Sequence, residues 1–312
     1  MVINNETGAF AAEQVGGLLR RLAYQTGRTA KSPHAAEVHD LRVAIRRFTQ
    51  ALAAFDTCLP IPEVKKIKRR LKKTMRLAGD VRDYDIAIEM LSRFKSAPAA
   101  ILTSFRKRRK EAERDLTAAL GHWVERRTYS RWRAALHSRG SGDVSHDPIA
   151  TTATRAIEPM LEEFASRGKR ALAPKASIEK IHRLRIEAKK VRYTLELFAP
   201  VYGAPVEGWM ERLKSLQNVL GAISDCETVR EMIERQGGDR RIESALRRKV
   251  NRKLAEFRQL WEDSLAHEPI DIGASRSPRL RASRAWCGWP RGSGAGLETR
   301  CRTGVLPHLV VG

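Results

Sequence analysis

The sequence contains an internal repeat, and this repeat limits the possible fold more than any other feature. Residues 38–55, VHDLRVAIRRFTQALAAF, match residues 181–198, IHRLRIEAKKVRYTLELF, 143 positions later. A second pair of segments, 71–91 and 213–233, matches at nearly the same offset. Two matches in register are hard to obtain by chance, so the sequence predicts a duplicated structural unit.

Both halves of the duplication carry the periodicity of amphipathic helices. In the first copy the apolar positions step by three and four residues: Val38, Leu41, Ile45, Phe48, Leu52 and Phe55. Helices are predicted at 38–55, 63–78, 83–94, 99–120 and 123–138, and then at 152–167, 177–199, 206–221, 224–236 and 240–266. Gly79 is expected to end one helix, Asp83 to cap the next, and Pro159 to kink or shorten its own. No segment alternates like a β-strand, so we expect an all-α protein.

The repeat also divides the chain into two halves and a tail. The segment RGSGDVSHDP between the halves is rich in glycine and serine and ends in proline, which is typical of a linker. Toward the C-terminus the helical periodicity is lost and Gly, Ser, Pro and Arg dominate, which is typical of disorder. We therefore expect a first helical repeat at 1–138, a linker at 139–150, a second helical repeat at 151–268 and a disordered basic tail at 269–312.

The charge of the chain points to a polyanion as partner. There are 59 Lys and Arg against 36 Asp and Glu, a formal net charge of +23. The hydrophobic fraction of 42% is enough to bury a core, which excludes wholesale disorder. No apolar run approaches the roughly 20 residues of a membrane helix, and no secretion signal opens the chain. The four cysteines have neither metal-binding nor disulfide-framework spacing. We expect a cytoplasmic protein without a membrane partner, metal or cofactor.

The basic residues are concentrated beside the apolar stripes. On a helical wheel, one strip next to the stripe holds His39, Arg42 and Arg46 in the first half and His182, Arg185, Lys189 and Arg192 in the second. The following helix of the first half adds Lys65, Lys68, Arg69, Lys72 and Arg76 on one side. Cations beside a core stripe cost repulsion and partial desolvation. Because both halves carry this cost, we expect a bound anion to offset it, with the histidines donating to phosphate oxygens.

The residue types found among the basic residues indicate which kind of anion binds. Binders of single-stranded nucleic acid combine a basic track with stacking aromatics, but the basic strips hold only Tyr193. Four tryptophans, Trp123, Trp132, Trp209 and Trp261, are expected to pack between helices. No helix-turn-helix signature occurs, while nonspecific binding of nucleic acid stays open for any chain this basic. The P-loop motif is absent, and the basic faces hold no acidic cluster for Mg²⁺. Asp80, Asp83 and Asp85 could suggest a metal loop, but a helix cap is the simpler role for Asp83. We assign no catalytic residue and expect a binding protein rather than an enzyme.

The repeated motifs resemble those of the CHAD domain, the conserved histidine α-helical domain. HDLRVAIRRF and HRLRIEAKKVRY share the pattern HxLRxxx followed by two basic residues, and GDVRDYD at 79–85 is similar to the family's glycine and Arg-Asp turn. The resemblance covers about residues 6–265. It implies two tandem pseudo-symmetric four-helix bundles with a basic central cavity that binds inorganic polyphosphate.

The resemblance carries a polyphosphate-binding role onto matching positions of this chain. The motif residues are His39, Arg42, Arg46 and Arg47 in the first half, His182, Arg185, Lys189, Lys190 and Arg192 in the second, and Arg82 in the turn. Ser224 stands where the second half would repeat Arg82. The expected site is completed by Lys65, Lys68, Arg69, Lys72, Arg76, Tyr193 and Lys214. Two alternatives stay open: nonspecific nucleic-acid binding, and a scaffold on polyphosphate or storage granules that docks an acidic partner.

Overall fold

The computed structural model describes residues 7–94, 98–137, 148–174 and 176–265, and every regular element in them is a helix. The helices are α1 (Thr7–Lys31), α2 (Ala35–Ala54), α3 (Ile61–Ser92), α4 (Ala99–Glu125), α5 (Thr128–His137), α6 (Ile149–Leu172), α7 (Ile178–Tyr202), α8 (Ala204–Glu234) and α9 (Arg240–Ser264), with a short 3-10 turn η1 (Asp56–Cys58). The all-α prediction is confirmed. The predicted tail and most of the predicted linker lie outside the described residues.

The sequence prediction was wrong in the middle of α3 and α8. Each was expected to be two helices separated near Gly79 or Gly221, but both run through these glycines without a break. Asp83 therefore lies inside α3 instead of capping a helix. The helix continues because its buried stripe crosses the glycine, through Ile67, Leu71, Thr74, Ala78 and Val81.

Gly79 serves the packing of α2 against α3 rather than the end of a helix. A Cβ atom at this position would stand 3.0 Å from the guanidinium nitrogen Nη1 of Arg42. Glycine inside a helix costs about 1 kcal/mol relative to alanine. Because Gly79 has no side chain, the Arg42 side chain can lie directly on the α3 backbone.

Two further differences concern α6 and α1. Pro159 lies inside α6, yet the helix spans Ile149–Leu172 and is longer than expected, not shorter. Buried contacts at Ile157 and Phe164 on either side of the proline hold the two turns in place. The helix α1 was missed in the sequence, although its buried positions repeat at helical spacing: Phe10, Ala11, Val15, Leu19 and Leu22.

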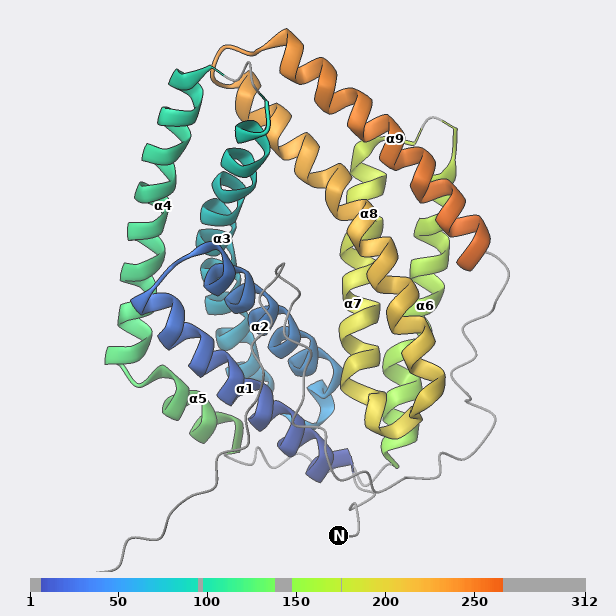
Figure 1. The fold of residues 1–312 in the computed structure, drawn as a ribbon. Coiled ribbons are helices and arrows are strands. Elements are labelled where there is room, and N and C mark those ends of the chain that lie inside the picture. The colour runs from blue at the N-terminus through green and yellow to red at the C-terminus, as the bar shows by residue number, and fades with distance from the viewer. Residues whose placement is uncertain (1–6, 95–97, 138–147, 175, 266–312) are drawn as a thin grey trace, which may run out of the picture.

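Equivalent helices of the two halves contact each other. Within the halves, α1 packs on α2 and α3 on α4, as α6 does on α7 and α8 on α9. Between the halves, α2 contacts α7 and α3 contacts α8. Figure 1 shows α1–α5 on one side of the molecule and α6–α9 on the other. Because α2 repeats as α7 and α3 as α8, this is the contact pattern expected of a pseudo-twofold arrangement.

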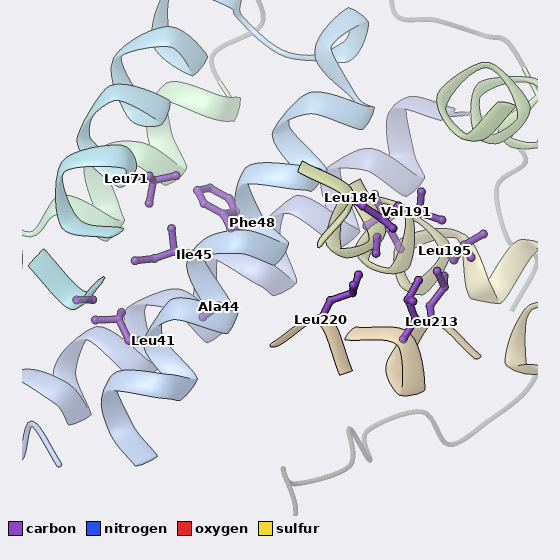
Figure 2. Packing of buried hydrophobic residues seen from close by; sticks show 14 of the residues in the cluster. Leu41, Ala44, Ile45, Phe48, Leu71, Leu184, Val191, Leu195, Leu213 and Leu220 are labelled. Atoms are coloured by element: carbon purple, nitrogen blue, oxygen red, sulfur yellow. The ribbon is translucent and has the colours of Figure 1, made fainter. Parts of the chain in front are cut away.

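Apolar side chains pack within each half, and aromatic rings pack between the two halves. Figure 2 shows one group of buried side chains between α2 and α3 and a second between α7 and α8. Phe55, which follows α2, contacts its repeat counterpart Phe198 of α7 at a ring-centroid distance of 5.5 Å. Phe10 of α1 packs on both rings, at 6.1 and 6.3 Å. Aromatic pairs of this kind contribute about 0.5–1.5 kcal/mol each beyond their burial, so the α2–α7 junction is a well-defined support for the site.

The four tryptophans among the described residues are packing residues, as expected. Trp123, Trp209 and Trp261 are buried. Trp132 packs edge-on against Trp123 at 4.9 Å. In the part of the chain that the structure describes, no helix has both the length and the apolar character needed to cross a bilayer.

Candidate functional site

Side chains from the two repeated motifs meet at one place, which we call the central cluster. Electrostatic coupling links Arg42 with Arg185, and Arg46 with Lys189. Each of these pairs consists of repeat counterparts, as expected if the motifs face a common axis. The cluster comprises His39, Arg42 and Arg46 of α2, Arg82 and Asp83 of α3, His182, Arg185 and Lys189 of α7, and Asp225 of α8.

Three cations of the central cluster, Arg42, Arg185 and Lys189, are poorly hydrated. Burial, followed by the charges of Arg46 and Arg185, lowers the pKa of Lys189 to about 6. Burial, followed by Arg46, lowers the pKa of Arg42 to about 10. Burial also lowers the pKa of Arg185, although Asp225 opposes the shift. Since such shifts measure how strongly the surroundings disfavour the charged form, the cluster is a place of incompletely compensated positive charge.

The guanidinium groups of Arg42 and Arg185 are fixed in different ways. Nη1 of Arg42 donates a hydrogen bond to the backbone carbonyl of Met75, at 3.2 Å. Nη2 of Arg185 lies 3.9 Å from a carboxylate oxygen of Asp225. Among the described residues, the buried Nε of Arg185 has no hydrogen-bond acceptor. A buried donor without a partner is costly, so this nitrogen is suited to an anion that is not part of the chain.

Two carboxylates belong to the central cluster although neither was predicted as a site residue from the sequence. Asp83 and Asp225 are repeat counterparts, and they lie close enough to influence each other. Burial is the largest effect on both and raises the pKa of each carboxyl group, while Arg42 and Arg185 oppose it. The signal was present in the alignment of the repeats, since both aspartates follow a repeated glycine at the same distance. The carboxylates reduce the excess of positive charge without cancelling it.

The two histidines lie at the exposed edge of the central cluster. Loss of hydration, followed by the charge of Arg82, lowers the pKa of His39. Loss of hydration, followed by Arg185, lowers the pKa of His182. Both imidazoles are therefore neutral at pH 7 and can each donate one hydrogen bond. A bound anion would favour their protonated form and add charge to the site.

Three predicted site residues form the junction between α2 and α7 instead. Nε of Arg47 donates to a carboxylate oxygen of Glu196 at 2.9 Å, and Glu196 also pairs with Arg192 at 3.6 Å. The guanidinium groups of Arg47 and Arg192 lie 5.9 and 5.0 Å from the ring centroid of Tyr193. These contacts hold the two halves together beside the central cluster.

Lys190 was expected in the site but turns away from it. Its ammonium lies 3.1 Å from a carboxylate oxygen of Glu187, a buried residue. Glu187 also pairs with Arg167 of α6, at 3.7 Å. Lys190 therefore neutralises a buried carboxylate in its own half, although its counterpart Arg47 lies at the junction.

The basic residues of α3 continue the positive charge away from the central cluster on one side only. The α3 row, as we name it, consists of Lys65, Lys68, Arg69, Lys72 and Arg76. Arg76 pairs with Asp80, at 3.7 Å, so the excess positive charge of the row lies mainly between Lys65 and Lys72. Lys68 and Lys72 share a helix face with Gly79, against which Arg42 lies. In α8 the positions equivalent to Lys65 and Arg69 hold Glu207 and Glu211.

Lys214, the α8 counterpart of Lys72, does not extend the positive charge. Its ammonium pairs with Glu211, at 3.7 Å. Within the described residues, no group of three or more His, Cys, Asp or Glu side chains is placed to hold a metal ion. The resemblance implied a basic central cavity, and the described geometry is that of a half-buried cationic cluster between α2, α3, α7 and α8.

Comparison with known proteins bears on the fold and the family. The family model of the CHAD domain matches residues 13–234. The crystal structure of the CHAD domain from the plant Ricinus communis is similar, with a TM-score of 0.61 and 20% sequence identity over 90% of this chain and 97% of that one. The structure of PptA from Streptomyces chartreusis has a TM-score of 0.61 and 15% identity, over 82% of this chain and 99% of that one. No curated protein matches the chain. At these sequence identities the two structures show only that the fold is similar.

Proposed function

The chain belongs to the CHAD domain family, and we propose that its central cluster binds inorganic polyphosphate. One observation carries the proposal. Arginine and lysine residues from equivalent positions of both halves meet in a half-buried place, where burial and mutual repulsion lower the pKa values of Arg42 and Lys189. An arrangement that costs free energy in the isolated protein is stabilised when a multivalent anion binds.

The chemistry of polyphosphate matches the donors of the central cluster. The ligand carries negative charge along its whole length, accepts hydrogen bonds at every phosphate and has no base to stack. Arginine guanidinium groups hold phosphate oxygens with directed hydrogen bonds, while Lys189 acts as a point charge. The free Nε of Arg185 and the neutral histidines supply further donors. The α3 row provides a continuation for a longer chain.

The surroundings of Tyr193 favour polyphosphate over single-stranded nucleic acid. A base-stacking aromatic must present a free face. Tyr193 is only 5% exposed, and both Arg47 and Arg192 lie over its ring. This residue therefore cannot act as a stacking platform, and the described central cluster contains no other aromatic ring than the two imidazoles.

The proposed role is binding, not catalysis. The carboxylates of the central cluster, Asp83 and Asp225, both interact with arginine residues. We propose that the protein uses this binding to reside on cytoplasmic polyphosphate granules. Incubation of the pure protein with polyphosphate and Mg²⁺ should release no phosphate, and steady phosphate release would contradict the non-enzymatic role.

Isothermal titration calorimetry with long-chain polyphosphate tests the site. The double variant Arg42→Gln with Arg185→Gln should bind at least about 100-fold more weakly, because each charge-assisted hydrogen bond contributes roughly 1.5–3 kcal/mol. The control is Arg106→Gln with Arg247→Gln, which removes the same charge from exposed positions on α4 and α9. The control should lose less than about threefold, because exposed charges contribute little individually. Equal losses in both would show that affinity comes from net charge alone.

Competition separates the proposal from its two alternatives. Long-chain polyphosphate should displace labelled single-stranded DNA, whereas DNA should hardly displace polyphosphate. The opposite order would favour a nucleic-acid-binding protein. In cells, deletion of polyphosphate synthesis should abolish granule localisation, and unchanged localisation would favour docking to an acidic protein partner.

A further inference from the structure

A hollow lies at the corner formed by α1, α4 and α5, three helices that contribute nothing to the central cluster. Figure 1 shows α5 passing beneath the end of α4 and beside α1. The cavity has a volume of about 260 Å³. Its apolar lining consists of Leu19, Leu22, Ala23, Trp123, Val124 and Trp132. Val124 is 57% exposed at its edge, so this apolar surface is open to solvent.

Two buried hydroxyl groups in the cavity wall lack partners. Thr26 of α1 and Thr128 of α5 are 3% and 2% exposed, and both line the cavity. Within the described residues, neither hydroxyl makes a hydrogen bond. An unsatisfied buried hydroxyl costs about 1–3 kcal/mol. Two of them beside one cavity point to a polar group that belongs to a ligand.

The polar end of the cavity is electropositive. Thr128 is the first residue of α5, and the first amides of a helix have no intrahelical acceptor and favour an anion. Arg127, in the turn between α4 and α5, lines the cavity and has a φ of 46°, which is uncommon for arginine. Burial, followed by the charges of Arg126 and Arg131, lowers the pKa of the neighbouring Arg70. The Glu125 carboxylate lies 3.5 Å from Nδ1 of His122 and is largely exposed to solvent, which screens its charge.

We propose that this cavity binds a small amphipathic anion, with an apolar and preferably aromatic body and a single carboxylate or sulfonate group. The body would lie against the indoles of Trp123 and Trp132. The anionic group would accept hydrogen bonds from the threonine hydroxyls and the first amides of α5, with Arg127 beside it. Pockets for drug-sized ligands begin at about 300 Å³, so the volume limits the ligand to a small molecule. Polyphosphate has no apolar body and would not be a ligand here.

The test uses the fluorescent probe 8-anilinonaphthalene-1-sulfonate with the intact full-length chain. The probe should bind saturably and with enhanced fluorescence. Apart from its chain neighbours and the backbone of its own helix, no heavy atom lies within 4 Å of a Cβ placed on Gly27, a helical residue in the cavity wall. The substitution Gly27→Leu should therefore fill the cavity and weaken probe binding at least tenfold. It also raises the helix propensity of α1, so the melting temperature should be maintained or raised.

The second variant and a second probe test the charge requirement. Arg127→Asn removes the cation, and asparagine tolerates the left-handed backbone at this position. It should weaken binding of the sulfonate about tenfold, which is about 1.4 kcal/mol. The uncharged analogue N-phenyl-1-naphthylamine should bind the original protein at least tenfold more weakly than the sulfonate. Equal binding of the two probes, or sulfonate binding unchanged in a folded Gly27→Leu variant, would overturn the proposal.

Discussion

Lys189 should make polyphosphate binding dependent on pH. Its pKa in the free protein is about 6, because of burial and the charges of Arg46 and Arg185. At pH 7.5, only about 3% of free molecules therefore carry this charge. A phosphate chain bound in the central cluster would raise the pKa of Lys189 toward its ordinary value. Binding at pH 7.5 should then be accompanied by the uptake of close to one proton at this residue.

The size of the expected change in polyphosphate affinity with pH follows from the linkage between protonation of Lys189 and binding. Below pH 6 Lys189 is charged in both the free and the bound protein, so it contributes no pH dependence. Above pH 6 only the bound form retains the proton, and affinity should fall about tenfold per pH unit. Between pH 6.5 and 8.5 this residue alone should lower the affinity by up to about 100-fold.

Calorimetric titration with polyphosphate across this pH range measures the effect. Titrations in HEPES and in Tris, which have different ionisation enthalpies, report the proton uptake directly. Lys189→Arg keeps a permanent charge and should remove the contribution of Lys189 to the slope while retaining tight binding. It also controls for titration of His39, His182 and the ligand, which occur in both proteins. Equal slopes for the original protein and this variant would refute the reasoning.

Three further predictions concern the surroundings of the cluster. Lys72→Glu, in the α3 row, should weaken polyphosphate binding about tenfold in calorimetry, whereas Lys214→Glu, with the same charge change, should cost less than about threefold; equal effects would contradict the one-sided continuation. Asp225→Asn should bind polyphosphate severalfold more tightly and, because burial raises the pKa of Asp225 and so disfavours its charged form, should maintain or raise the free energy of unfolding in denaturant titrations; weaker binding would show that Asp225 positions Arg185. Gly79→Ala should maintain or raise the melting temperature through about 1 kcal/mol of helix propensity, yet weaken binding severalfold by displacing the Arg42 guanidinium; unchanged affinity would show that Arg42 need not lie on α3.

The internal repeat was the sequence feature that predicted most of the fold and of the candidate site. It identified Arg42 and Arg185 as equivalent positions beside apolar stripes, and the structure brings them together with Lys189. It also predicted two helical halves, because the spacing of buried residues is a local property of each segment. Both predictions depend only on the residue spacing within single helices and on the matching of the two copies.

The errors arose where a residue acts on a different helix. Gly79 was interpreted as a helix end because glycine commonly has this role, while its actual neighbour is a guanidinium from α2. Asp83 was interpreted as a helix cap because aspartate is common at the start of a helix. Lys190 was placed in the site by its motif, but Glu187 and, through it, Arg167 of α6 determine its direction. Contacts between helices are set by tertiary packing, which periodicity in one helix does not contain.

A crystal structure of the full chain with bound tripolyphosphate tests the central claim most directly. The account predicts phosphate oxygens in contact with Arg42 of the first half and Arg185 of the second half at the same time, with Lys189 beside them. Phosphate found only on outer helices such as α4 and α9, with the central cluster unchanged, would contradict it.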